Sequence, residues 1–150
     1  MRRRTATYPA AVLVVDDDPF LLQCVGAILR DTGYFVLSAS SPADAIEIES
    51  VYPGRIRLLL SDVEMPDMTG PDLAATLTAR RPGMRVLLMS ACGALRKPLF
   101  QPGWRFIQKP FGPAVLAGAV SDALSVDSRH PDQNLPSLFN HFPAPAPKPA

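Results

Sequence analysis

The feature that most constrains the fold is a short apolar run that leads directly into acidic residues. Residues 11–15 read Ala-Val-Leu-Val-Val and are followed by three aspartates. The run is too short for an ordinary helix and is rich in β-branched residues, so it predicts a strand buried on both faces. Asp18 and Pro19 then predict a helix start, because an aspartate oxygen caps a helix whose first residue is proline.

The same alternation of strand and helix continues along the chain. Further apolar runs predict strands at 34–39, 56–60, 85–89 and 104–108, and helical patterns occupy 18–33, 41–50, 70–81 and 113–124. Strands that alternate with helices indicate a parallel sheet with helices on both faces. We therefore expect an α/β fold, a small doubly wound domain around a five-stranded parallel sheet.

Composition excludes several classes of protein. The chain has 150 residues, of which 47% are hydrophobic, and its net charge of +1 lacks the basic excess of a dedicated nucleic-acid binder. No apolar run is long enough for a membrane span, and the N-terminus lacks the apolar region of a signal peptide. Cys24 and Cys92 have no neighbours at zinc-ligand spacing. We expect a cytoplasmic protein with reduced thiols.

Proline divides the chain into regions. Six of the 17 prolines lie in residues 127–150, and the stretch 143–150 alternates Pro with Ala or Lys. Such a segment favours extended polyproline II structure. We expect a flexible N-terminus at 1–9, a domain at 10–126 and a disordered Pro-rich tail at 127–150. The alternative is a short docking helix, because four apolar residues recur at helical spacing in the tail: Leu135, Leu138, Phe139 and Phe142.

Reactive side chains follow four of the five predicted strands: Asp16 and Asp17, Asp62, Ser90 and Lys109. Each alone has an ordinary explanation as a cap, a loop residue or a solvated lysine. Because the carboxyl ends of parallel strands share one edge of the sheet, their coincidence favours a common site. Carboxylates suit Mg²⁺, and the lysine and hydroxyl add a cation and a donor. The set predicts a pocket for a small dianionic group, most simply a phosphoryl group.

Four motifs in this order resemble the receiver domain of the response regulators of bacterial two-component signalling, the CheY-like superfamily. They lie at 12–19 (VLVVDDDP), 59–70 (LLSDVEMPDMTG), 86–91 (VLLMSA) and 106–111 (FIQKPF). The resemblance covers roughly residues 10–125. It implies a flavodoxin-like fold, with a five-stranded parallel sheet of order 2-1-3-4-5 flanked by five helices.

The resemblance also implies a phosphoacceptor and a metal site. Asp62 would accept a phosphoryl group from the histidine of a sensor kinase. Asp16 and Asp17 would bind Mg²⁺ together with Asp62 and the backbone carbonyl of Glu64. A carboxylate is a competent nucleophile for such a transfer, and Mg²⁺ would neutralise the phosphoryl oxygens.

The remaining motif residues would contact the phosphoryl group or change position in response to it. By resemblance, Lys109 would pair with the phosphoryl oxygens, Ser90 would hydrogen-bond one of them, and Phe106 would be the aromatic switch residue. The peptide bond between Lys109 and Pro110 would be cis. A phosphoryl group adds charge and acceptors, so movement of Ser90 toward it would leave space for Phe106.

Residues 92–103 depart from the family pattern. Receivers have a regular fourth helix there, whereas this chain has Gly93, Pro98, Pro102 and Gly103. Proline inside a helix removes a hydrogen bond and clashes with the preceding turn. We therefore expect a short or irregular fourth helix and an altered output surface.

Several functions are consistent with these residues. The leading hypothesis is a receiver in a phosphorelay, stand-alone or part of a hybrid kinase, and not an enzyme. Its partners would be a sensor histidine kinase or phosphotransfer protein and an unknown downstream protein, with no direct nucleic-acid or membrane contact. One alternative is a phosphatase of the haloacid-dehalogenase kind, because Asp16 and Asp18 form an Asp-x-Asp after a strand, although Pro19-Phe20 is unlike that family. Another is a degenerate receiver that binds partners without phosphorylation.

Overall fold

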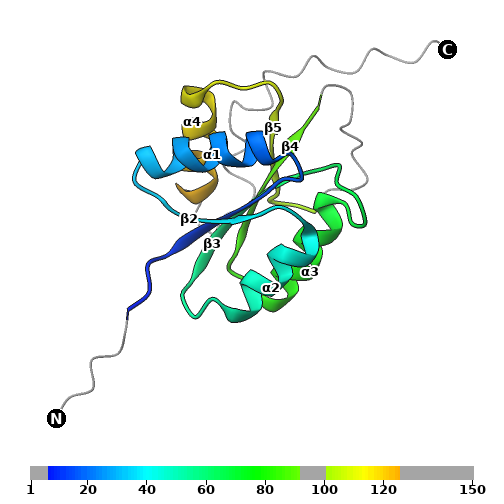
Figure 1. The fold of residues 1–150 in the computed structure, drawn as a ribbon. Helices are drawn as coiled ribbons and strands as arrows, with labels where there is room; N and C mark the ends of the chain where they lie inside the picture. The colour runs from blue at the N-terminus through cyan, green and yellow to red at the C-terminus, as the bar shows by residue number, and fades with distance from the viewer. Residues whose placement is uncertain (1–6, 92–100, 126–150) are drawn as a thin grey trace.

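The computed structural model describes residues 7–91 and 101–125. Within them, five strands form one parallel sheet of order β2-β1-β3-β4-β5. Helices α1 and α4 cover one face of this sheet and α2 and α3 cover the other (Figure 1). The predicted fold class and strand order are confirmed. The elements are β1 (Ala11–Val15), α1 (Pro19–Asp31), β2 (Phe35–Ala39), α2 (Pro42–Val51), β3 (Ile56–Asp62), α3 (Gly70–Arg80), β4 (Arg85–Ser90), β5 (Arg105–Gln108) and α4 (Pro113–Ser125).

The central strands are apolar throughout because both faces of the sheet are covered. Successive side chains of a strand point to opposite faces. Val12 and Val14 of β1 pack in the core beneath α1 and α4, whereas Leu13 and Val15 pack in the core beneath α2 and α3. All five residues of β1 are buried, whereas the edge strand β2 begins with the partly exposed Phe35.

Side-chain caps fix the turns that lead from strands into helices. Asp18, Ser41 and Thr69 each accept a backbone N–H from the first turn of α1, α2 and α3, respectively. Each of these helices has a proline among its first two residues, where no intrahelical partner for its nitrogen is needed. After α1, Gly33 adopts a φ of 100°, a conformation that glycine permits at little cost. The predicted helix limits at Asp18 and Gly33 are confirmed.

Strands β3 and β4 run one or two residues further than their apolar runs. Asp62 is the last residue of β3 and Ser90 the last of β4. These polar residues therefore belong to the hydrogen-bonded sheet and are held by its rigid framework rather than by a free loop.

Some sequence predictions concern residues outside the described ranges. The irregular fourth helix predicted within 92–103 falls mainly on 92–100, and the Pro-rich tail predicted at 127–150 lies wholly outside the described residues. The residues just before β5 form a turn, in which the amide of Trp104 donates to the carbonyl of Gln101 at 3.2 Å and Gly103 has a φ of 89°. In the part of the chain that is described, no helix is long and apolar enough to cross a membrane.

Candidate functional site

Three carboxylates gather at the carboxyl ends of the neighbouring strands β1 and β3. Asp16 and Asp17 follow β1, and Asp62 ends β3. One oxygen from each lies within 4.8 Å of the others. Asp16 and Asp62 are only 1% and 9% exposed, whereas Asp17 is exposed. The structure thus brings the adjacent Asp16 and Asp17 together with Asp62, which lies 46 residues after Asp16 in the sequence.

Lys109 adds a cation to this cluster from the far side of β4. Its Nζ lies 3.1 Å from Asp16 Oδ2 and 3.2 Å from Asp62 Oδ1. Its backbone amide donates to the carbonyl of Ser90 at 2.7 Å, which continues the pairing of β4 with β5 past the last strand residue. The peptide bond from Lys109 to Pro110 is cis, as predicted. One ammonium group therefore bridges the carboxylates of β1 and β3.

Burial and neighbouring charges shift the pKa values of Asp62 and Lys109. Burial raises the pKa of Asp62, and the nearby negative charges of Asp16 and Asp17 add to that rise, while Lys109 opposes it. Burial alone would lower the pKa of Lys109, but its hydrogen bond to Asp16 and the charge of Asp62 outweigh burial and raise it. Lys109 is therefore held in its charged form, while the ionised Asp62 lacks full compensation.

Gly70 is a supporting residue that the sequence marks as a helix start and as the last residue of the motif at 59–70, with no indication of its packing role. A Cβ at this position would lie 2.1 Å from the backbone carbonyl oxygen of Asp62. The Gly70 amide also donates to the carbonyl of Val63 at 2.8 Å. The first residue of α3 therefore presses against the end of β3, and only glycine fits. The sequence signal was a glycine immediately before Pro71, but spacing alone did not reveal the contact.

The other predicted site residues lie around this cluster. Ser90 is completely buried, and its hydroxyl donates to the carbonyl of Ala91 at 3.0 Å. Glu64 is exposed, two residues beyond Asp62. Phe106 lies on β5, partly buried against the core beneath α2 and α3. None of these three residues takes part in the ion pairs of Lys109 with Asp16 and Asp62.

Asp18 differs in role from its two acidic neighbours. Its carboxylate accepts from the amides of Phe20 and Leu21 at 3.0 and 3.3 Å, which caps α1. Its own amide donates to Asp16 Oδ1 at 2.9 Å. The helix cap therefore orients the buried carboxylate of Asp16, and the side chain of Asp18 serves the helix.

Comparisons with known proteins agree with this geometry. The profile of the response regulator receiver domain matches residues 12–121. The transcriptional regulatory protein GlrR of Escherichia coli (strain K12) is 33% identical over 128 residues, which cover 83% of this chain and 28% of GlrR. The probable transcriptional regulatory protein TcrX of Mycobacterium tuberculosis is 35% identical over 112 residues, which cover 73% of this chain and 47% of TcrX. The chain thus spans less than half the length of either regulator.

A solved structure has a similar fold. The response regulator receiver domain protein from Clostridium thermocellum superposes with a TM-score of 0.70 at 27% sequence identity. The superposition covers 77% of this chain and 94% of that protein.

Proposed function

Because this chain belongs to the response regulator receiver domain family, we propose that it is the phosphoacceptor of a two-component phosphorelay. A sensor histidine kinase or a phosphotransfer protein would donate the phosphoryl group in the cytoplasm, and residues 10–126 would form the receiver. The observation that carries this proposal is the contact of Lys109 with both Asp16 and Asp62, beside Asp17. A helix cap or a solvated lysine would not require four side chains from three strand ends to converge.

The donor set fits Mg²⁺. Asp16, Asp17 and Asp62 supply only oxygen atoms, which a hard cation prefers, and one of them is exposed enough to leave room for water. We propose these three carboxylates and the backbone carbonyl of Glu64 as its protein ligands. The raised pKa of Asp62 supports a cation here, because a second positive charge would stabilise its ionised form. When bound, Mg²⁺ would supply charge neutralisation for the phosphoryl oxygens.

Asp62 would be the nucleophile in the transfer. One of its carboxylate oxygens would form a bond to phosphorus while the bond from phosphorus to the donor's histidine nitrogen breaks, which gives an acyl phosphate on Asp62. Lys109, already 3.2 Å from Asp62 Oδ1, would exchange this contact for one with a phosphoryl oxygen. The chain's own residues therefore position the acceptor and balance its charge, which is most of what phosphoryl transfer requires.

Ser90 and Phe106 would couple this chemistry to a protein-interaction surface. The hydroxyl of Ser90 donates to the carbonyl of Ala91 in the unphosphorylated chain. A phosphoryl oxygen is a stronger, charged acceptor, so phosphorylation would favour movement of Ser90 toward Asp62. Phe106 lies on the adjacent strand and would follow into the vacated space, which would change the surface presented to a downstream protein.

The structure gives a reason to prefer this proposal to a phosphatase. An Asp-x-Asp phosphatase would need Asp18 as a second acidic group facing its substrate. Here the Asp18 carboxylate caps α1 through two backbone amides. A degenerate receiver is also disfavoured, because Asp16, Asp17, Asp62, Ser90 and Lys109 are all present.

Intact-mass measurement after incubation with acetyl phosphate and Mg²⁺ tests the proposal. We expect a mass gain of one phosphoryl group per chain, released by hydroxylamine as an acyl phosphate is. Asp62→Asn should show no gain, whereas Asp67→Asn, a change of the same type at an exposed loop position, should label as the parent does.

Two results would count against a receiver. Labelling that persists in Asp62→Asn would place the acceptor elsewhere. Continuous hydrolysis of a generic phosphate ester with Mg²⁺, rather than stoichiometric labelling, would favour the phosphatase.

A further inference from the structure

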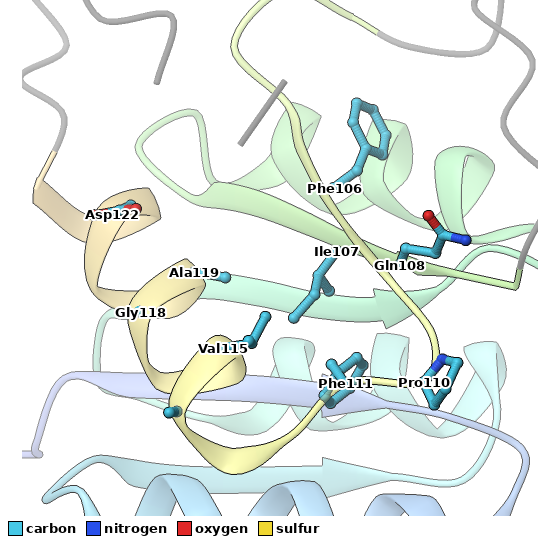
Figure 2. A pocket seen from close by; sticks show the side chains of 10 residues that line it. Phe106, Ile107, Gln108, Pro110, Phe111, Val115, Gly118, Ala119 and Asp122 are labelled. Atoms are coloured by element: carbon cyan, nitrogen blue, oxygen red, sulfur yellow. The ribbon is translucent and has the colours of Figure 1, made fainter. Parts of the chain in front are cut away.

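An apolar groove lies between the edge strand β5 and helix α4 (Figure 2). Its volume is about 300 Å³, and its lining includes Ile107, Phe111, Ala114, Val115 and Gly118, with Asp122 at one end. Figure 2 shows Ile107 pointing toward α4 and Phe106 pointing away from it. This volume is at the lower end for ligand cavities, so the groove suits a few apolar side chains rather than a large cofactor.

The groove exposes apolar surface that the described residues 7–91 and 101–125 leave uncovered. Leu116, Ala119 and Val120 of α4 are buried in the core, but Val115 is 54% exposed. A Cβ added at Gly118 would meet no atom of the residues that the structure describes within 4 Å, so they leave the space beside Gly118 open. Exposed apolar surface in a concave site is typical of a place where another segment docks.

The sequence carries a segment of matching chemistry shortly after the last residue of α4. Helix α4 ends at Ser125, and residues 126–150 follow it. Within them, Leu135, Leu138, Phe139 and Phe142 have the spacing of one helical face.

The connecting chain is long enough to reach the groove. Residues 126–134 between α4 and the apolar segment can span roughly 30 Å when extended. Helix α4 itself is about 20 Å long, as its 13 residues rise about 1.5 Å each. The segment can therefore fold back along the whole of α4. Arg129 in the connection would also pass near Asp122 and the carbonyl end of the helix, which favour a cation.

We propose that residues 135–142 of this chain dock into the groove between β5 and α4. The docked segment would cover Val115, which is 54% exposed, and fill the open space beside Gly118. Because β5 leads directly into Lys109, the segment would lie against the strand that delivers the site's cation, and a downstream protein would have to displace it to bind this groove. The docking itself does not depend on phosphorylation of Asp62.

Site-specific photocrosslinking in the full chain tests this proposal. Phe139→benzoylphenylalanine places a photoreactive ketone in the segment without removing its aromatic ring. After irradiation of the purified, unphosphorylated protein, we expect crosslinks within one chain that map to residues 106–122. Gly118→Glu should reduce their yield by roughly tenfold or more, because docking would bury the new carboxylate.

Gly83→Glu is the matched control. Its Cβ also meets no atom within 4 Å, but it lies in the turn before β4, away from the groove. It should leave the crosslinks unchanged.

If Gly118→Glu does not fold, hydrogen exchange provides a second measurement, since Leu138→Ser should speed exchange in residues 113–122 but not in α1. Crosslinks only between chains would indicate a second copy as the occupant. That result, scattered crosslinks, or unchanged exchange would each overturn the proposal.

Discussion

The folded protein without a bound metal disfavours the ionised form of Asp62. Burial raises its pKa above the ordinary value of 3.8, with Asp16 and Asp17 contributing in the same direction. The folded protein therefore holds a proton on Asp62 more tightly than the unfolded chain does. The stability that this provides is fully present below about pH 3.8 and is lost as the pH rises through the higher folded pKa. At neutral pH, the ionised carboxylate consequently costs stability.

Asp62→Asn should therefore raise the melting temperature of the metal-free protein at pH 7. Each 1 kcal/mol gained corresponds to roughly 4 °C in a domain of this size. The difference between variant and parent should shrink as the pH falls toward 4, because the parent becomes neutral at this position. Calorimetry in a chelating buffer at several pH values measures it. An equal difference at every pH would show that the charge of Asp62 is not its cause, and Asp67→Asn serves as the exposed control.

Gly70 is the second residue at which a small change has a large expected effect. Gly70→Ala should lower the free energy of unfolding by about 1–3 kcal/mol, because its Cβ would meet the backbone of Asp62, which cannot move cheaply. It should also reduce phosphoryl labelling by displacing Asp62. Urea denaturation measures the first effect and intact mass the second. Gly83→Ala adds a Cβ in open space and should change neither; equal losses in the two variants would contradict the close-packing argument.

Some important residues could be predicted from the sequence and others could not, and the reason is physical. Asp16, Asp17, Asp62 and Lys109 could be predicted because each follows an apolar strand, and parallel strands bring such ends together. Gly70 and Glu49 could not, because their importance comes from contacts with residues that local spacing does not mark. Glu49 lies on α2, where the sequence indicates only an ordinary helix, yet it is 6% exposed.

At the scale of elements, Arg81 joins α2 to α3. Its guanidinium donates to the Glu49 carboxylate at 3.1 Å and to the carbonyls of Glu49, Tyr52 and Gly54 at 2.9, 2.9 and 2.8 Å. Arg80 also pairs with Glu49 at 3.1 Å, but its side chain is 48% exposed against 25% for Arg81. The end of α2 and the turn into β3 are thus held to the end of α3 by one buried carboxylate and mainly one arginine.

Arg81→Ala should lower the free energy of unfolding by about 3 kcal/mol, because it leaves Glu49 buried with a weaker partner and three carbonyls without a donor. Arg80→Ala should cost less than about 1 kcal/mol, as expected for an exposed ion pair. Chemical denaturation of the two variants beside the parent provides the comparison. If Arg80→Ala cost as much as Arg81→Ala, the ranking by burial and hydrogen bonding would be wrong.

The elements themselves followed from the sequence because local signals and the global fold agree. The helix starts at Asp18 and Ser41 lie where the caps and prolines indicate, and the central strands lie where apolar runs occur. Their carboxyl-terminal ends could not be fixed from hydrophobicity alone. Sheet pairing extends β3 and β4 onto Asp62 and Ser90, where the side chains are polar but the backbone still has a neighbouring strand.

At the scale of the whole molecule, the site exists only in the folded chain. Lys109 contacts Asp16 across 93 residues of sequence, and Asp62 joins them from a third strand. In the unfolded chain these groups are far apart on average, so a cation that needs the three carboxylates together binds the native state preferentially. Metal binding and folding are consequently linked, and the melting temperature reports on both.

Mg²⁺ should therefore raise the melting temperature of the protein in a concentration-dependent way, with about 2.7 kcal/mol gained when its concentration is 100 times the dissociation constant. Asp17→Ala should abolish most of this rise while leaving the metal-free melting temperature nearly unchanged, because Asp17 is exposed and lies outside the core. Asp67→Asn should retain the full rise. Thermal melts across a Mg²⁺ titration, each started from chelator-treated protein, measure all three. An equal rise in Asp17→Ala and the parent would show that Mg²⁺ stabilises the protein elsewhere, and no rise in the parent would remove Mg²⁺ from the site.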